Sequence, residues 1–296
     1  MKTVTVLLST YNGECYLKEL LDSVLAQKNV NLSLLIRDDG STDNTLSILK
    51  EYDKTNHNIT LIEGTNKGYI KSFWSLLMNA PASDYYAFCD QDDIWQEDKC
   101  ISAIQLMEKT NYKGPFLYTS NVKGMDENGN VIKETVFPVQ SVLSFADSLQ
   151  RGSLPGCTFI FNEELKKEAM KYHGPQISHD WTLYIIAKAT GKVIYDKQSY
   201  IYYRLHEDNT VGIDESKIKH IKKKINRFIN NDYKQVRSSI AKNILEIYGL
   251  EMSKEDKEIA ELFATYTSNP LKALQLTKYK EYRNPNFLIQ ALTKKI

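Results

Sequence analysis

The sequence lacks the features that would assign it to a membrane, a secretory pathway or a nucleic-acid partner. None of its 296 residues lies in an apolar run approaching the roughly 20 residues that a membrane-spanning helix needs, so we expect no segment to cross a bilayer. The N-terminus, MKTVTVLLSTYNGE, is interrupted by Asn12, Gly13 and Glu14 where a signal peptide would continue its apolar core. We expect it to form a first strand instead.

Charge and cysteine content are equally uninformative about partners. A formal net charge of +1 gives the whole molecule no electrostatic reason to bind nucleic acid, so any charged partner has to be recognised locally. The four cysteines form neither a CxxC pair nor a spacing typical of His-paired metal sites: Cys15, Cys89, Cys100 and Cys157. Reduced thiols in the cytoplasm are the simplest interpretation.

The first 90 residues do contain an alternation of strand and helix patterns. Apolar runs predict strands at 4–8, 32–36, 59–62 and 85–89, and apolar residues at helical spacing predict helices at 14–27, 43–49 and 70–78. Such alternation is typical of βαβ units and predicts a largely parallel sheet. A polar cluster follows each strand, and ligands bind where the carboxyl ends of parallel strands meet. Four loops are therefore expected to face one crevice.

Beyond residue 98 the pattern is mixed. It predicts helices at 101–107 and from Trp181, strands at 116–120 and 157–161, and a turn at 126–129, which together would complete the sheet. After residue 212 the composition shifts to Lys, Ile and Asn, which suggests a helical extension. The expected organisation is a first half at 1–98, a second half at 99–212 and a helical segment at 213–296.

The segment DQDDIW at 90–95 places three carboxylates directly after an apolar strand. Clustered oxygen ligands suit Mg²⁺, Mn²⁺ or Ca²⁺ rather than zinc or copper. A calcium loop is excluded, because Ile94 and Ile101 would occupy ligand positions and the required glycine is missing. One or two carboxylates with a substrate diphosphate fit better. A solvated turn that caps the next helix is the alternative.

Five segments in order resemble the glycosyltransferases of family 2: STYNGE at 9–14, RDDGSTD at 37–43, NKGYIKSF at 66–73, DQDDIW at 90–95 and HDW at 179–181. The resemblance covers roughly residues 1–212 and implies the GT-A fold, an α/β fold with a mostly parallel sheet flanked by helices. The HDW form, together with YRLH at 203–206 and NTVG at 209–212, is most similar to bacterial rhamnosyltransferases of capsule and cell-wall polysaccharide assembly.

The resemblance implies a nucleotide-sugar donor, a dTDP- or UDP-sugar. Ser9 and Tyr11 match positions that hold the nucleotide, with Tyr11 stacking on the base, and Asp39 matches the carboxylate that accepts a hydrogen bond from a pyrimidine. Lys67 or Lys71 would lie near the diphosphate. A turn residue is the alternative for Asp39, and a solvated side chain is the alternative for each lysine.

A divalent cation, Mn²⁺ or Mg²⁺, is implied at the acidic cluster. Asp90 matches the residue that contacts the ribose or a metal-bound water, and Asp92 matches the direct metal ligand. His206 matches a late histidine that reaches the metal or the diphosphate, and Arg204 would meet a phosphate.

On the acceptor side, Asp180 matches the catalytic base of an inverting transfer, with an N-cap of the following helix as its alternative. His179 replaces the Glu of many family members and would orient Asp180, touch a substrate or pack. Asp93 would bind the acceptor or cap a helix. Trp95 and Trp181 would be platforms for a sugar ring, or core residues.

Residues 217–229, KIKHIKKKINRFI, form a basic amphipathic pattern. Such a helix can lie on an anionic membrane surface, at the inner face of the cell membrane, and would bring the site to a polyprenyl-linked saccharide acceptor. A helix packed on its own domain is the alternative. The leading hypothesis is an inverting, metal-dependent transfer of L-rhamnose from dTDP-L-rhamnose. A UDP-sugar transferase and a non-catalytic saccharide-binding protein are the alternatives.

Overall fold

The computed structural model describes residues 1–137, 142–150, 155–205 and 232–279, which form two compact units. The first comprises Met1–Val142, Leu154–Met170 and Gly191–His206, and the second comprises Leu143–Ser153, Lys171–Thr190 and Glu207–Ile296. This division differs from the expected boundaries at 98 and 212. The reason is that strands from both expected halves pair in one sheet, whereas helix α7 (His179–Thr190) belongs with the C-terminal helices.

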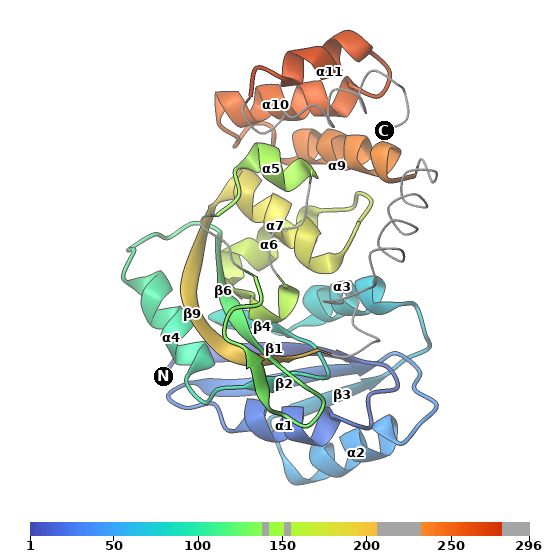
Figure 1. Ribbon diagram of the computed structural model, residues 1–296, viewed down its shortest axis with the longest axis vertical. Helices are drawn as coiled ribbons and strands as arrows, with labels where there is room; N and C mark the ends of the chain where they lie inside the picture. Colours follow the sequence, from blue (N-terminus) through green and yellow to red (C-terminus); the bar gives the residue numbers. More distant parts are fainter. Residues whose placement is uncertain (138–141, 151–154, 206–231, 280–296) are drawn as a thin grey trace. The chain divides into compact units, whose positions relative to one another are not determined.

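The parallel part of the sheet in the first unit was predicted by sequence periodicity. Strands β1 (Thr3–Thr10), β2 (Asn31–Asp38), β3 (Ile59–Glu63) and β4 (Tyr85–Cys89) pair in the order β3-β2-β1-β4, all parallel. Helices α1 (Leu17–Leu25) and α2 (Thr45–Thr55) cover one face of these strands, and α3 (Tyr69–Asn79) covers the other (Figure 1).

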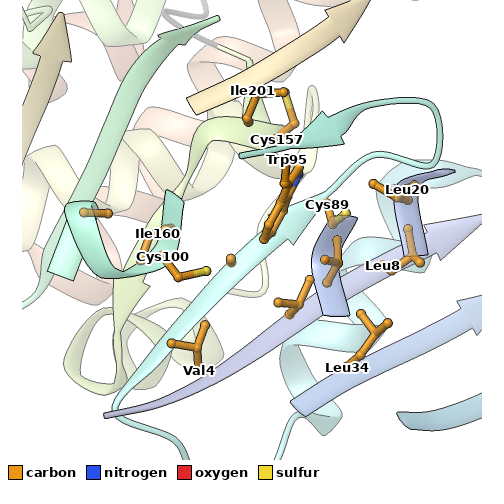
Figure 2. Packing of buried hydrophobic residues seen from close by; sticks show 14 of the residues in the cluster. Val4, Leu8, Leu20, Leu34, Cys89, Trp95, Cys100, Cys157, Ile160 and Ile201 are labelled. Carbon is orange, nitrogen blue, oxygen red and sulfur yellow. The ribbon is translucent and has the colours of Figure 1, made fainter. Parts of the chain in front are cut away.

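Alternation along the buried strands explains how both faces are covered. Val4, Val6 and Leu8 of β1 pack into one apolar cluster with the buried side of α1, part of which Figure 2 shows. Successive strand residues point to opposite faces. On the face of α3, Phe73 meets Phe88 of β4 edge to face, with 5.5 Å between ring centroids.

The rest of the sheet continues the order as β8-β6-β9-β5. Strand β8 (Ile160–Asn162) runs antiparallel to β4 and to β6 (Phe116–Met125), whereas β9 (Lys192–Arg204) is parallel to β6 and antiparallel to β5 (Ile94–Trp95). Strand β7 (Val131–Lys133) closes a hairpin with β6 across the expected turn. Helices α4 (Lys99–Glu108) and α6 (Glu163–Lys171) and the 3-10 turn η1 (Gly156–Thr158) complete the elements.

Described helices of the second unit are α5 (Phe145–Gln150), α7, α9 (Asp232–Tyr248), α10 (Lys254–Thr265) and α11 (Pro270–Leu276). Of these, α9, α10 and α11 lie in the expected C-terminal helical extension, whereas α5 and α7 lie before it. The Ser238 hydroxyl donates to the Ala264 carbonyl at 2.6 Å and joins α9 to α10. Within the described ranges, no helix combines the length and the apolar character needed to span a bilayer.

Candidate functional site

Four loops of the first unit emerge from one edge of the sheet, at the carboxyl ends of β1 to β4. Register places Thr10 of β1 beside Asp38 of β2, Asp38 beside Glu63 of β3, and Leu8 beside Cys89 of β4. Ser9, at the end of β1, and the loops after these strands carry residues assigned to the donor and the cation; the loop residues are Tyr11, Asp39, Lys67, Asp90 and Asp92. Parallel pairing alone explains why these distant segments lie along one edge.

Asp39 follows β2 directly, and its side chain is buried. Two residues apart, Arg37 and Asp39 lie on the same side of the chain and form a buried ion pair. The backbone N–H groups of Lys67 and Gly68 also donate to the Asp39 carboxylate, at 3.0 Å and 2.9 Å. Asp39 therefore ties the loop after β2 to the loop after β3. The Asp39 side chain is buried, and its contact with a pyrimidine stays a prediction.

Ser9 belongs to the same network. Its hydroxyl donates to the Ser72 hydroxyl at 2.6 Å, and Arg37 Nη1 donates to the Ser72 oxygen at 3.1 Å. Lys67 and Lys71 both have exposed side chains, so this arrangement does not choose between them for a diphosphate contact.

Tyr11 presents its side chain to solvent on a loop whose backbone is held on both sides. Its ring is accessible, with the residue 45% exposed. Asn12 follows with φ of +48°, and its side-chain oxygen accepts from the Thr42 N–H at 2.8 Å. The Gly13 N–H donates to the Thr45 hydroxyl at 2.8 Å. An exposed ring on an anchored backbone suits the predicted stacking on a base.

Burial separates the three carboxylates of the acidic loop. Asp90 and Asp92 are half-buried, whereas Asp93 is only 1% exposed. Burial, and then the charges of Asp92 and Asp90, raise the pKa of Asp93 well above its ordinary value and favour its neutral form. This relieves the repulsion that three adjacent anions would create. The N-cap of α4 is Asp98, which does not agree with the alternative role of Asp93 as a helix cap. Burial of Asp93 does not favour a direct contact with the acceptor, and that role stays a prediction.

Trp95 is a core residue, which was the alternative to its predicted acceptor role. It is 3% exposed, and Figure 2 shows its ring among Cys89, Cys157 and Ile201. The Lys99 ammonium lies 3.4 Å from the ring centroid, and burial lowers the pKa of that amine. A sugar platform has to be accessible, so the burial of Trp95 favours the alternative role as a core residue.

Arg204 holds the backbone of the acidic loop and is 1% exposed. Its Nε donates to the Asp92 carbonyl at 3.1 Å, and its Nη1 donates to the Glu127 carbonyl at 2.8 Å. Nη2 forms an ion pair with Glu19 at 2.6 Å, and the guanidinium lies 4.3 Å from the Tyr16 ring centroid. With these groups around it, Arg204 positions Asp92, and the predicted contact with a phosphate does not agree with its burial.

The donor atoms of the acidic loop fit a hard divalent cation. Ligand atoms of Asp90, Asp93 and Cys157 lie within 4.8 Å of one another, and Asp92 belongs to the same loop. Burial raises the pKa of the Cys157 thiol and of the Asp93 carboxyl and favours the protonated form of both, so the half-buried Asp90 and Asp92 supply the remaining oxygen ligands. Oxygen ligands are those that Mg²⁺ and Mn²⁺ prefer. His206 and residues 217–229 lie outside the described residues.

In the second unit, Asp180 lies in the first turn of α7. The Ser178 hydroxyl accepts from the Trp181 N–H at 3.3 Å, as an N-cap does three residues before its donor. One oxygen of Asp180, Oδ1, accepts from the Ser178 hydroxyl and from the Trp181 N–H, the latter at 2.7 Å. The alternative role of helix cap thus falls mainly to Ser178. Asp180 itself is half-buried.

The two neighbours of Asp180 are held within the second unit. His179 is buried, which lowers the pKa of its imidazole to about 4 and keeps the ring neutral at pH 7. Such burial does not suit a direct acceptor contact. The half-buried Trp181 donates its indole N–H to the Ser148 carbonyl at 2.6 Å, and the Arg237 guanidinium lies 5.5 Å from its ring centroid. Its role at the acceptor stays a prediction.

Three residues of the site were not singled out from the sequence: Arg37, Gln91 and Glu19. The spacing of Arg37 and Asp39 at the end of a strand is a usable signal, because residues two apart share a face. Gln91 and Glu19 carry no such signal, since their partners are far away in the chain.

Comparisons with known proteins agree with this geometry. The model of the family "Glycosyl transferase family 2" matches residues 5–162. The dTDP-rhamnosyl transferase RfbG of Shigella flexneri is 36% identical over 222 residues, covering 71% of this chain and 75% of that protein. The crystal structure of S. aureus TarS 1-349 matches 100% of this chain and 80% of its own, with a TM-score of 0.62 and 20% identity.

A mannosyltransferase from Pyrobaculum calidifontis, PcManGT, solved with GDP-Man and Mn²⁺, matches 99% of this chain and 86% of its own, with a TM-score of 0.56 and 18% identity. These structural likenesses support the fold. From the family match, the identity to RfbG and the mixed, mostly parallel sheet, we conclude that the chain belongs to glycosyltransferase family 2 and is an enzyme with the GT-A fold.

Proposed function

We propose that this enzyme transfers L-rhamnose, with inversion, from dTDP-L-rhamnose to a saccharide carried on a polyprenyl lipid. The observation that carries the proposal is the 36% identity to a protein named as a dTDP-rhamnosyl transferase, extending over three quarters of that protein's length. Family membership alone leaves the donor open, because a few pocket residues decide it.

The donor nucleotide would lie along the carboxyl edge of β1 to β4. Tyr11 offers an exposed ring for the base, and the loop that Asp39 anchors lies beside it in the sheet order. Lys67 or Lys71 would meet the diphosphate, since both ammonium groups are exposed. Ser9 supports this edge through its hydrogen bond to Ser72.

Asp92 and Asp90 would hold Mg²⁺ or Mn²⁺ with the diphosphate of the donor. A cation held there neutralises negative charge on the departing nucleoside diphosphate. The chain would contribute the placement of Asp92, because Arg204 Nε donates to its backbone carbonyl at 3.1 Å.

Asp180 would act as the general base. Its carboxylate takes the proton from an acceptor hydroxyl while that oxygen forms a bond to the anomeric carbon, on the face opposite the phosphate. The bond between the anomeric carbon and the phosphate oxygen breaks, and its electron pair leaves with dTDP. Ser178 and the Trp181 N–H engage Oδ1, which orients the carboxylate.

The proposed donor is tested by calorimetric binding of sugar nucleotides in which base and sugar are varied separately. With Mn²⁺ or Mg²⁺ present, we expect dTDP-L-rhamnose to bind at least about tenfold more tightly than dTDP-glucose, UDP-GlcNAc or GDP-mannose, a preference of about 1.4 kcal/mol. Removal of the cation with EDTA should weaken binding of dTDP-L-rhamnose, because two carboxylates would then face the diphosphate directly.

The variant Asp92→Ala tests the proposed metal site in the same binding experiment. We expect it to remain folded and to bind dTDP-L-rhamnose with an affinity that no longer depends on Mn²⁺. If the protein binds a UDP-sugar more tightly than dTDP-L-rhamnose, the proposed donor is wrong. If the unmodified protein binds the donor equally well without a cation, the proposed metal site is wrong.

A further inference from the structure

The side-chain amide of Gln91 makes with Tyr11 the pair of hydrogen bonds that a neighbouring strand would make. The Tyr11 N–H donates to Gln91 Oε1 at 2.8 Å, and Gln91 Nε2 donates to the Tyr11 carbonyl at 3.1 Å. One side chain thus satisfies both backbone polar groups of a residue 80 positions away. We call this pair of hydrogen bonds the Gln91 clamp.

The Gln91 clamp joins the two ends of the proposed nucleotide site. Gln91 stands between Asp90 and Asp92, which we assign to the cation, and Tyr11 carries the ring that we assign to the base. Strands β1 and β4 are neighbours in the sheet, so the segments that follow them leave it side by side. A base contact and a cation contact are therefore linked through one amide.

Gly13 leaves the room that the clamp needs. A Cβ at this position would lie 2.5 Å from Gln91 Oε1 and 2.6 Å from Gln91 Cδ, closer than non-bonded atoms approach. The described glycines with positive φ are Gly40, Gly68 and Gly129, so the backbone at Gly13 accepts alanine without strain. Alanine at position 13 would therefore act mainly by displacing the amide of Gln91.

The segment that carries Tyr11 and the acidic loop that carries Gln91 each make a second hydrogen bond to another part of the first unit. The Gly13 N–H is bound to the Thr45 hydroxyl, and the Asp92 carbonyl is bound to Arg204 Nε. Gln91 is therefore the contact between two segments that are each also held elsewhere.

We infer that Gln91 is a positioning residue that makes nucleotide binding at Tyr11 and cation binding at Asp90 and Asp92 cooperative. This inference rests on the proposed function. Coupled sites raise each other's affinity by the same factor, typically about 5-fold to 150-fold. Loss of the clamp lowers that factor, whereas a general loss of structure would weaken binding with and without the cation alike.

The test measures the dissociation constants of dTDP and, in parallel, of UDP, each with Mn²⁺ and with EDTA. For the unmodified protein and Gln91→Ala, the ratio of the two constants gives the enhancement by the cation. We expect Gln91→Ala to lower this ratio at least about fivefold, within the range of such couplings, while its thermal unfolding remains cooperative. An unchanged ratio in Gln91→Ala would overturn the inference but leave the proposed function standing.

Gly13→Ala is a second variant that should break the Gln91 clamp and so lower the enhancement of nucleotide binding by the cation. We expect it to lower the ratio as Gln91→Ala does, and to have no further effect in the Gln91→Ala background, because the atoms that its Cβ meets are then gone. Gly114→Ala is the matched control, since a Cβ there would meet the Tyr112 side chain, away from the site. Additive losses in the double variant would contradict the clamp. Absence of any cation-enhanced nucleotide binding in the unmodified protein would contradict the metal site of the proposed function, and the inference with it.

Discussion

Asp180→Asn should lower the rate of sugar transfer by about 10²- to 10⁴-fold, the usual contribution of a general base. Asparagine keeps the size and the hydrogen-bonding geometry at Oδ1, so the Ser178 and Trp181 contacts are retained. What is lost is the ability to take a proton from the acceptor hydroxyl. Affinity for dTDP-L-rhamnose should be unchanged, because this carboxylate is not assigned to the donor. Initial rates at saturating donor, together with donor binding by calorimetry, check both expectations.

Asp256→Asn is the matched control for this variant. Asp256 also lies in the first turn of a helix of the second unit and also accepts from a preceding serine hydroxyl, that of Ser253, at 2.8 Å. We expect its substitution to leave the transfer rate within a factor of about two, since a single surface exchange usually has a small effect. Equal losses in the two variants, or full activity in Asp180→Asn, would remove Asp180 from the role of base.

Asp39→Ala should lower the free energy of unfolding by about 3–5 kcal/mol, the usual cost of removing one partner of a buried ion pair. The Arg37 guanidinium would remain buried without its counter-charge, and the N–H groups of Lys67 and Gly68 would lose their acceptor. Urea unfolding measures the change. Unfolding is measured without nucleotide, so the predicted contact between Asp39 and a pyrimidine does not affect it. The measurement therefore reports the structural role of Asp39 alone.

Glu63→Ala is the control for this variant, because Glu63 forms an ion pair with Lys50 at 2.8 Å on the exposed side of the neighbouring strand. Exposed pairs contribute about 0–1 kcal/mol, so its loss should be small. Adding Arg37→Met to Asp39→Ala should recover part of the stability, since no charge then remains unpaired. Equal effects of Asp39→Ala and Glu63→Ala would show that the ion pair does not hold this edge together.

The parallel part of the fold could be predicted because its signal is local. Apolar residues fall on alternate positions of β1, where Val4, Val6 and Leu8 share a face, and α1 carries its buried residues at helical spacing. Strand β9 carries no such signal. Asp196, Lys197 and Gln198 interrupt it, and its pairing with β6 shifts register twice. Pairing with β6 keeps residues 192–204 extended, and the sequence of these residues alone does not predict that partner.

The site, too, could be predicted only where its signal is local in the sequence. The order of the motifs predicted which loops carry the donor and cation residues, because parallel strands deliver their carboxyl ends to one edge. The local sequence pattern does not predict that Asp92 is half-buried and Asp93 almost completely buried. That difference comes from β5, which pairs with β9 and carries Trp95 into the core, and Arg204 is buried at the end of the same pair.

The central claim is that a divalent cation at the acidic loop holds the diphosphate of a nucleotide whose base lies at Tyr11. Anomalous X-ray scattering at the manganese edge, from crystals grown with Mn²⁺ and dTDP, tests it most directly. We expect one strong anomalous peak beside the Asp92 carboxylate, in contact with the diphosphate, and the thymine ring against Tyr11. A nucleotide bound elsewhere, or a manganese peak away from Asp90 and Asp92, would contradict the claim.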